Sequence, residues 1–431
     1  MFVTKLKSLS LHHPTGHVSG RVKLDYSKSI SNRVLIIRSL CKQPIALNFA
    51  SQSDDTKSLA QLLRSSEFIL NVGQAGTTFR FLTALLAVSN QRHLLTGSER
   101  IRQRPISDLV DALRAIGANI TYTEKEGFAP ILIEQYKYNL NNEVSIAANV
   151  SSQFISALLM IAPTLPNGLK IRLEGNVVSR PYIDMTLKIM QNFGVSHIWQ
   201  EPDYIIISPQ SYVHTDFDIE ADWSAAAYYF SIASSSQSAD ITLEGLFENS
   251  IQPDATICEI AKSFGIETHF SNNTIRIIKN INAPISSVFE WDFTNCPDIA
   301  QTCAVMCACK GIKGLLSGLS TLKVKETDRI KALQNELLKI GCHLSLLPQR
   351  FSKNNKREFY LIDGDLNIEN TLSAPYFITY GDHRMAMSFA PIGLLTPIVI
   401  DDPDVVSKSY PNFWKDLETL GFNIIVNEKL V

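Results

Sequence analysis

The sequence lacks any long uninterrupted hydrophobic run, although hydrophobic residues make up 45% of its 431 positions. Its longest nearly uncharged stretch, residues 385–400, is too short for a membrane-spanning helix and contains Pro391 and Pro397. The first residues, MFVTKLKSLSLHHP, lack both the apolar core of a signal peptide and the arginine-rich bias of a transit peptide. We therefore expect a soluble protein of the cytoplasm.

An excess of charge of one sign is also missing. Lysine and arginine together number 40 and the acidic residues 42, which gives a net charge of -2. A chain this close to neutrality has no overall field that would attract nucleic acid or an acidic membrane. We expect neither as a partner, and any anionic ligand must be bound by a local cluster of cations.

Cysteine is sparse and shows no paired pattern. The seven cysteines include no CxxC pair, and their odd number is typical of a reducing compartment. Cys303, Cys307 and Cys309 lie close together in IAQTCAVMCACKG, where the spacing of Ile299, Cys303 and Met306 fits a buried helical face. Core thiols explain this spacing better than metal ligands do. We expect no metal and no cofactor.

Several short motifs of catalysis and phosphate binding are absent as well. The sequence contains no GxxxxGK[ST] loop, and GQAGTT at residues 73–78 does not match GxGxxG. It contains no HExxH zinc motif and no GxSxG nucleophile motif. Short β-rich runs instead alternate with amphipathic helices, and the chain length suggests about two or three domains of the α/β class.

The densest run of charge is LKVKETDRIKAL at residues 322–333, which passes from a strand-like alternation into a helical pattern. The expected helix has Ile330, Leu333 and Leu337 on one face, and Gly341 is placed to end it. The charges therefore lie at the start of a helix, where backbone N–H groups and the helix dipole favour an anion. A solvated helix start explains the run equally well when it is considered alone.

Other helix starts carry similar polar clusters. They read SKSISNR at residues 27–33, GQAGTTFR at 73–80, SSQ at 151–153, SRPY at 179–182, CPD at 296–298 and DHR at 382–384. Helix capping explains each hydroxyl taken singly. Arg33, Arg80 and Arg384 are different, because a cation near the start of a helix opposes the dipole and favours a bound anion. The repetition predicts a shared ligand that carries phosphate and carboxylate groups.

Taken in order, these clusters closely resemble the motifs of the 3-phosphoshikimate 1-carboxyvinyltransferase (EPSP synthase) family of enolpyruvyltransferases. The same resemblance extends to RQRPI, VKETDR, YGDHRMAM and SKSYP, and it runs from about Lys23 to Pro411. It implies a two-domain inside-out α/β barrel, in which each domain has three βαβαββ repeats with central helices and outer sheets. The domains would be residues 1–22 plus 221–431 and residues 23–220, with the active site in the cleft between them.

The resemblance also implies a reaction and a set of site residues. The enolpyruvyl group of phosphoenolpyruvate would pass to the 5-hydroxyl of shikimate 3-phosphate by addition and elimination through a tetrahedral intermediate. The residues that resemble the family's catalytic groups are Asp298, Glu326, Lys28 and Lys408. Those that resemble its shikimate 3-phosphate contacts are Lys28, Ser29, Arg33, Ser151, Ser152, Gln153, Ser179, Tyr182, Asp298 and Lys325. Those that resemble its phosphoenolpyruvate contacts are Lys28, Gly76, Arg104, Gln153, Arg329, Arg384 and Lys408.

The sequence departs from the family pattern at a few positions. Asp25 and Tyr26 replace a Pro-Gly pair, and Phe81 replaces a proline that usually follows the arginine of the GTxxR stretch. Gly381 and Thr321 stand where the family often has asparagine, so one substrate contact through Thr321 is in doubt. Glyphosate occupies the phosphoenolpyruvate site in this family, and the replacement at Phe81 leaves sensitivity to it open.

Two alternative functions remain. A related enolpyruvyltransferase that acts on UDP-N-acetylglucosamine resembles this fold, but it normally uses a cysteine-bearing loop and a different acceptor pocket. A non-catalytic binder of phosphorylated metabolites would gain nothing from Asp298 and Glu326, since both are acids that would face anions. We expect small-molecule partners only and, from the family, a monomer.

Overall fold

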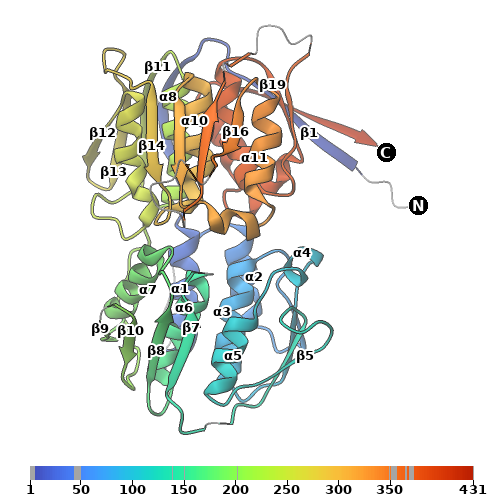
Figure 1. Ribbon diagram of the computed structural model, residues 1–431, viewed down its shortest axis with the longest axis vertical. Helices are drawn as coiled ribbons and strands as arrows, with labels where there is room; N and C mark the ends of the chain where they lie inside the picture. Colours follow the sequence, from blue (N-terminus) through green and yellow to red (C-terminus); the bar gives the residue numbers. More distant parts are fainter. Residues whose placement is uncertain are drawn as a thin grey trace. The chain divides into compact units, whose positions relative to one another are not determined.

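The structure is a computed structural model that describes residues 5–42, 50–137, 139–149, 151–200, 202–348, 350, 357–364, 366–367 and 373–430 (Figure 1). The chain divides into two compact units. Unit 1 comprises Met1–Asp25 and Glu220–Val431, and unit 2 comprises Tyr26–Ile219. The N-terminal segment of the chain thus belongs to the same unit as its C-terminal half.

Within the described part of unit 1, the strands form three four-stranded sheets. The first has the order β12 (Ile266–Ser271), β13 (Thr274–Lys279), β11 (Ser238–Glu244) and β2 (His17–Lys23). The second has the order β14 (Val288–Asp292), β15 (Lys313–Ser317), β17 (Phe359–Asp363) and β16 (His343–Leu346). The third has the order β18 (Tyr376–Phe377), β19 (Ile398–Asp401), β1 (Lys5–His12) and β20 (Asn423–Leu430).

The described residues of unit 2 form two further four-stranded sheets. Their orders are β3 (Ile69–Asn71), β4 (His93–Thr96), β6 (Ile131–Glu134), β5 (Asn119–Tyr122), and β7 (Glu143–Ala147), β8 (Leu169–Glu174), β10 (Tyr204–Ile207), β9 (Ile198–Gln200). Every sheet of both units contains one parallel pair followed by two antiparallel pairs. A helix precedes the second strand of each parallel pair, and unit 2 is also inserted between β2 and β11, so the sheets repeat one βαβαββ plan. In unit 2, residues 43–49 of the remaining expected repeat lie outside the described residues.

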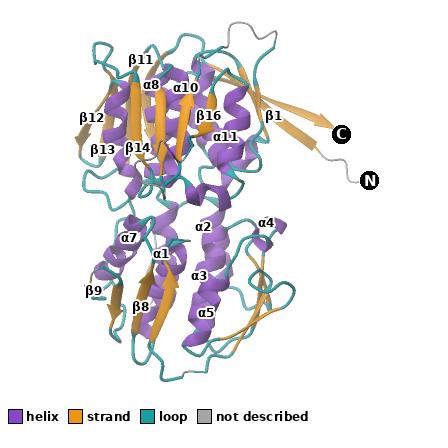
Figure 2. Ribbon diagram, in the orientation of Figure 1, coloured by secondary structure: helices purple, strands orange, loops and turns teal. Residues whose placement is uncertain are grey.

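Buried helices that contact one another form the centre of each unit. In unit 1, α8 (Trp223–Ser235), α10 (Ala300–Lys310) and α12 (His383–Phe389) contact one another, and most of their residues are buried. In unit 2, α1 (Lys28–Leu40), α3 (Gly76–Ala87) and α6 (Ser152–Ile161) do the same. A helix that is apolar nearly all round is stable only when other elements cover it. Figure 2 shows strands flanking these helices within each unit, so the predicted α/β class with central helices and outer sheets is confirmed.

The remaining helices are more amphipathic or short. They are α2 (Asp54–Leu62), α4 (Glu99–Arg102), α5 (Ser107–Ala115), α7 (Arg180–Asn192), α9 (Ile257–Ile260), α11 (Arg329–Leu338) and α13 (Phe413–Thr419). In the part of the chain that the structure describes, no helix is both long and apolar enough to cross a membrane.

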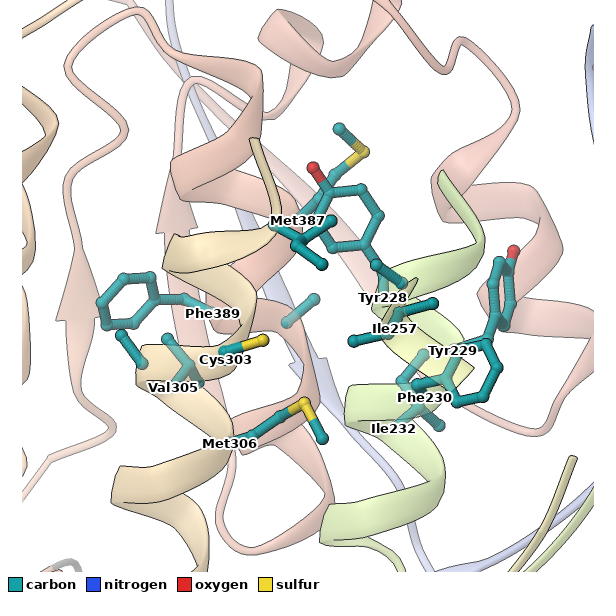
Figure 3. Close-up of a cluster of buried hydrophobic side chains, with 14 of the residues drawn as sticks. Tyr228, Tyr229, Phe230, Ile232, Ile257, Cys303, Val305, Met306, Met387 and Phe389 are labelled. Atoms are coloured by element: carbon teal, nitrogen blue, oxygen red, sulfur yellow. The ribbon is translucent and has the colours of Figure 1, made fainter. Parts of the chain in front are cut away.

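The core of unit 1 contains the cysteines of α10. Cys303, Met306 and Cys307 are fully buried, and Figure 3 shows Cys303 and Met306 pointing toward the neighbouring helix α8. There they meet an aromatic and aliphatic cluster that includes Tyr228 and Phe230. The interpretation as core thiols is therefore confirmed for Cys303 and Cys307, whereas Cys309, the third cysteine of that prediction, is only partly buried against the core.

Candidate active site

Unit 1 brings a dense set of charged side chains together, which we call cluster 1. Its members are Asp298, Lys325, Glu326, Arg329, Asp382, Arg384 and Lys408. They lie on the 3-10 helix η4 (Pro297–Ile299) before α10, in the turn between η5 (Ser320–Val324) and α11, at the start of α12, and on η8 (Pro403–Lys408). Segments far apart in the sequence thus supply one group of charges, and all but Asp382 had been predicted as site residues.

Helix caps fix the two arginines at the starts of their helices. The carboxylate of Asp328 accepts from the backbone N–H groups of Ile330 and Lys331, both at 3.1 Å, and thereby begins α11 at Arg329. The carboxylate of Asp382 accepts from the N–H of Arg384 at 2.9 Å and begins α12 in the same way. Because each cap satisfies backbone donors that a helix start leaves unpaired, the sequences TDR and GDHR place a cation in the first turn.

Arg329 is the hub of cluster 1. Its side chain is 2% exposed and forms a two-pronged pair with Asp382, with Nε–Oδ2 at 2.7 Å and Nη2–Oδ1 at 3.2 Å. Nη2 also donates to Glu326 Oε2 at 2.9 Å, and Nη1 lies 3.4 Å from Asp298 Oδ1. The planar guanidinium has five N–H donors in a fixed fork, so it can bind several carboxylates at once in a defined geometry. Arg329 therefore orients both acids that the sequence predicted to be catalytic.

Asp298 is held among cations. Its Oδ2 lies 3.1 Å from Arg384 Nη2, and its Oδ1 lies 3.4 Å from Lys325 Nζ. Burial opposes ionisation of this carboxyl, but Arg384, Lys325 and Arg329 outweigh it and hold the pKa of Asp298 well below its usual range. The group is consequently ionised and, with these partners in place, a weak proton acceptor.

Glu326 bridges two cations of the cluster. One carboxylate oxygen accepts from Arg329, and the other lies 3.1 Å from Lys408 Nζ. The side chain is 15% exposed, so solvent or a ligand can reach it. A carboxylate in such contact with a lysine has the geometry to exchange a proton with a reacting group nearby.

Unit 2 carries the other predicted residues, which we call cluster 2. Its members are Lys28, Ser29, Arg33, Gly76, Arg104, Ser151, Ser152, Gln153, Ser179 and Tyr182. All except Arg104, which follows α4, lie at or beside the first turns of α1, α3, α6 and α7. Side-chain hydrogen bonds join α1 to α6 and α7, and α6 to α3, so these helices form one connected group within the unit.

Arg33 links three of these helices. Its Nε donates to Thr186 Oγ1 of α7 at 2.7 Å, its Nη2 donates to Ser156 Oγ of α6 at 3.1 Å, and its Nη1 donates to the carbonyl of Ser29 at 2.8 Å. Among the described residues, no carboxylate forms an ion pair with Arg33, which is 2% exposed. Burial lowers the pKa of Arg33 to about 10. Its charge is thus surrounded by neutral oxygens, an arrangement that favours binding of an external anion.

Lys28 lies in the first turn of α1, which Ser27 caps. Its Nζ is 3.1 Å from Asp55 Oδ2 of α2, and this carboxylate is nearly buried. Thr78 of α3 donates to the carbonyl oxygen of Asp55 at 3.1 Å. Asp55 therefore positions Lys28 and also joins α2 to α3.

Gly76 provides close access to the backbone. A Cβ atom at this position would lie 2.5 Å from Arg104 Nη1 and 2.9 Å from Arg80 Nη1. Arg80 Nη1 donates to the carbonyl of Gly76 at 2.8 Å. Glycine leaves room for two guanidinium groups at the start of α3, and a larger residue would force them to move. The amide of Gln153 donates to Thr77 Oγ1 at 3.2 Å and joins α6 to the same place.

Serines complete cluster 2. Ser151 caps α6 by accepting from the N–H of Gln153 at 3.3 Å, and Ser152 is buried beside it. Ser179 precedes α7 with a left-handed φ of 56°, which is unusual for a residue other than glycine. Tyr182 follows one turn later, and its carbonyl accepts from Thr186 at 2.8 Å. Backbone strain of this kind is typical of functional sites.

Sequence reasoning missed several residues that support the predicted ones. Asp382 begins the DHR cluster, but no role was predicted for it, and the signal of Asp55 was weak because it lies at the start of α2, where no cluster was predicted. Thr186 and Ser156 lie inside helices, where a hydroxyl in an apolar pattern gives no sign of its partner. Within the described residues there is also no group of three or more histidine, cysteine or acidic side chains arranged to hold a metal ion.

Comparisons with known proteins agree with this geometry. Residues 63–417 match the family model of EPSP synthase (3-phosphoshikimate 1-carboxyvinyltransferase). The chain belongs to the EPSP synthase family. A 3-phosphoshikimate 1-carboxyvinyltransferase of Bacteroides fragilis (strain YCH46) is 43% identical over 413 residues, covering 96% of this chain and 98% of that protein. One of Neisseria meningitidis serogroup B (strain ATCC BAA-335 / MC58) is 33% identical, covering 93% and 95% of the two chains.

Solved structures of similar proteins have the same fold as this chain. An EPSP synthase of Acinetobacter baumannii superposes with a TM-score of 0.74 at 20% identity, covering 98% of this chain and all of that one. The enolpyruvyl transferase NikO of Streptomyces tendae superposes with a TM-score of 0.72 at 11% identity, covering 99% of this chain and 100% of that one. The family that the sequence motifs predicted is confirmed, and the EPSP synthase family consists of enolpyruvyltransferases of the shikimate pathway.

Proposed function

We propose that this enzyme transfers the enolpyruvyl group of phosphoenolpyruvate to the 5-hydroxyl of shikimate 3-phosphate and releases phosphate. The observation that carries the proposal is cluster 1, in which the carboxylates of Asp298 and Glu326 share Arg329 and pair with three further basic side chains. Membership of the EPSP synthase family over nearly the whole chain supports the choice of substrates.

Cluster 2 is the proposed site of shikimate 3-phosphate. Arg33 and Lys28 supply charge for its carboxylate and phosphate, while Ser151, Ser152 and Ser179 supply hydroxyl donors. Burial of Arg33 among neutral oxygens supports this role, because the ligand would provide the missing negative charge.

Cluster 1, together with Gly76, Arg104 and Lys28 of cluster 2, is the proposed site of phosphoenolpyruvate. Arg329 and Arg384 suit its carboxylate and phosphate, since a guanidinium can bind two oxygens side by side. Both clusters would act on the same pair of substrates, and the placement of the site in a cleft between the units remains a prediction.

The chemistry begins when the 5-hydroxyl oxygen adds to the second carbon of phosphoenolpyruvate while the methylene carbon gains a proton. Asp298 would accept the proton of the hydroxyl as the new C–O bond forms, and this proton would finally leave with the phosphate. Its low pKa makes it a weak base, but a substrate anion on Arg384 would offset the cations and raise its affinity for a proton.

Glu326 would give the proton to the methylene carbon, with Lys408 stabilising the carboxylate that forms. The tetrahedral intermediate then returns a proton from the methyl group to Glu326, the double bond forms again, and phosphate leaves. Lys28 would stabilise the charge of the departing phosphate.

We also propose a cytoplasmic, monomeric enzyme, which the seven free cysteines and the small-molecule substrates support.

The test is release of phosphate from phosphoenolpyruvate in the presence of shikimate 3-phosphate. We expect Glu326→Gln to lower kcat by about 10²–10⁴-fold with little change in substrate binding. Glu358→Gln is the matched control, because Glu358 forms an exposed ion pair with Lys323. Phosphate release with UDP-N-acetylglucosamine as the acceptor would instead support the related transferase, and binding without any release would support a non-catalytic binder.

A further inference from the structure

A buried carboxylate outside the predicted site lies behind cluster 1. Asp254 is on the 3-10 helix η2 (Pro253–Thr256) and is 2% exposed. Ser224, in the first turn of α8, donates a short hydrogen bond to Asp254 Oδ2. The cap of α8 by Asp222, which accepts from Ala225 N at 3.1 Å, fixes the position of Ser224.

The serine hydroxyl connects Asp254 to an arginine of the site. Ser224 Oγ accepts from Arg384 Nη2 at 3.3 Å while its hydrogen is donated to Asp254. The same Nη2 lies 3.1 Å from Asp298 Oδ2, and Nη1 donates to the carbonyl of Asp298 at 2.9 Å. Arg384 is therefore held between Asp298 on one side and the Ser224–Asp254 pair on the other.

The groups around Asp254 have opposite effects on its pKa. Burial raises the pKa of Asp254, the charge of Asp298 and, less strongly, that of Asp222 also raise it, and Arg384 and the hydrogen bond from Ser224 lower it; together they place it at about 7. A group with such a pKa changes its charge near neutrality.

The other titratable neighbours of Asp254 are the thiols of Cys296 and Cys303. Burial raises the pKa of Cys296 to about 12 and that of Cys303 far above its usual value, and the charge of Asp254 contributes to both shifts. Both thiols are therefore neutral in the physiological range. Asp254 and Asp298 are therefore the carboxylates of this neighbourhood whose charge can respond to a ligand on Arg384, and Asp254 has the pKa closer to neutrality.

We propose that Asp254 is a positioning residue in the binding of phosphoenolpyruvate. Asp254 orients Arg384 through Ser224, and it loses its negative charge by taking up a proton when the anionic substrate binds. The inference rests on the proposed function of Arg384 in binding phosphoenolpyruvate. An anion on Arg384 adds negative charge next to Asp254, so Asp254 takes up a proton when the substrate binds.

The sign of the pH dependence follows from this linkage. Below about pH 7 Asp254 is already protonated and does not oppose the anion, whereas above about pH 7 it is ionised and must first gain a proton. The affinity for phosphoenolpyruvate should therefore fall as pH rises through about 7. If binding raises the pKa of Asp254 by about one, the loss of affinity is about tenfold.

The first test compares Asp254→Asn with the unmodified enzyme. Asparagine keeps an acceptor for Ser224 but cannot ionise, so the variant should retain a low KM for phosphoenolpyruvate at high pH. Calorimetry in two buffers of different ionisation enthalpy should show proton uptake that is lost in the variant. Phosphoenolpyruvate itself titrates, and the readout is therefore the difference between the two proteins.

Ser224→Ala tests the connection to Arg384. It should raise KM several-fold at every pH and leave kcat within about threefold, because the arginine loses an orienting partner but the acids remain. Ser224→Thr, which keeps the hydroxyl, should restore the KM. This pair of variants keeps the proposal falsifiable even if Asp254→Asn fails to fold.

Glu220→Gln is the matched control. Glu220 is 3% exposed, accepts from the hydroxyl of Ser250 at 2.7 Å, and has a pKa raised by burial, so it resembles Asp254 in all but its link to Arg384. It should leave the pH dependence of KM unchanged. Equal pH dependence in Asp254→Asn and the unmodified enzyme, or no proton uptake on binding, would overturn the proposal. Failure of the unmodified enzyme to release phosphate would refute the proposed function, while the calorimetry would still test the inference.

Discussion

Replacing Arg33 by methionine tests whether this residue is required for the stability of the fold or for substrate binding. The guanidinium is buried against the oxygens of Thr186, Ser156 and Ser29, with no carboxylate of the described chain in an ion pair with it. Methionine has similar length and no charge, so Arg33→Met removes a buried cation while leaving most of the apolar contact in place. We expect the variant to fold and to lose affinity for shikimate 3-phosphate.

The expected magnitudes follow from the structure. A pKa lowered to about 10 means that burial costs the charged form of Arg33 about 3 kcal/mol. The variant avoids this cost, but it loses hydrogen bonds to neutral oxygens, each of which stabilises the fold by about 1 kcal/mol. The two effects nearly cancel, so the free energy of unfolding should change by less than about 2 kcal/mol. Removing the charge partner of a bound anion should weaken shikimate 3-phosphate binding by about 2–5 kcal/mol.

Urea unfolding with and without shikimate 3-phosphate measures both quantities. The unmodified protein should gain about 2.7 kcal/mol when the ligand is present at about 100 times its Kd, and the variant should gain far less. Arg114→Met is the control, since Arg114 is half-exposed on α5 and donates to the carbonyl of Ile120 at 2.9 Å. If Arg33→Met lost more than about 3 kcal/mol without ligand, Arg33 would be a structural residue and the reasoning would be refuted.

The remaining predictions concern cluster 1 and Gly76. Arg329→Met should lower the free energy of unfolding, measured by urea titration, by about 3–5 kcal/mol, because it leaves buried carboxylates unpaired. The free energy of unfolding of Arg329→Lys should lie between those of Arg329→Met and the unmodified protein. Gly76→Ala should raise the KM for phosphoenolpyruvate several-fold in steady-state assays, since its Cβ would displace the guanidinium of Arg104. The pKa of Asp298 is lower in the folded than in the unfolded chain, so its stabilisation is present above about pH 4 and is lost as pH falls below it. Asp298→Asn should accordingly show a shallower loss of stability between about pH 4 and pH 2.

The charged run at residues 322–333 shows how much of the site the sequence could predict. Alternation and capping rules placed the start of a helix there, and α11 begins at Arg329 with Asp328 as its cap. Lys325 and Arg329, which were predicted as site residues, contact Asp298 in the structure. Lys323, which was not predicted as one, pairs with Glu358 at the surface. Local sequence could not reveal that Asp382, more than fifty residues away, would bind the same guanidinium at 2.7 Å.

The fold was predictable for a different reason. Each sheet repeats a parallel pair and two antiparallel pairs, and the helix patterns between them are strongly apolar. Periodicity identifies such elements, but it does not say which helices meet at the centre; the family resemblance supplied that. The supporting hydroxyls of Thr186 and Ser156 had no signal, because a serine or threonine within an apolar helix has the same pattern whether or not it contacts an arginine.

The arginines of cluster 1 and Arg33 of cluster 2 have opposite surroundings, and this difference bears on how each could bind an anion. In cluster 1, Arg329 and Arg384 already form ion pairs with carboxylates, so a substrate must compete with Asp298 or change its protonation. In cluster 2, Arg33 is surrounded by neutral oxygens, and a substrate anion would displace no ion pair of the protein. Competition with Asp298 is useful where chemistry follows, because the substrate that displaces its cations also makes it a better base. Arg33 has no such acid beside it, which fits a position that binds substrate and takes no part in proton transfer.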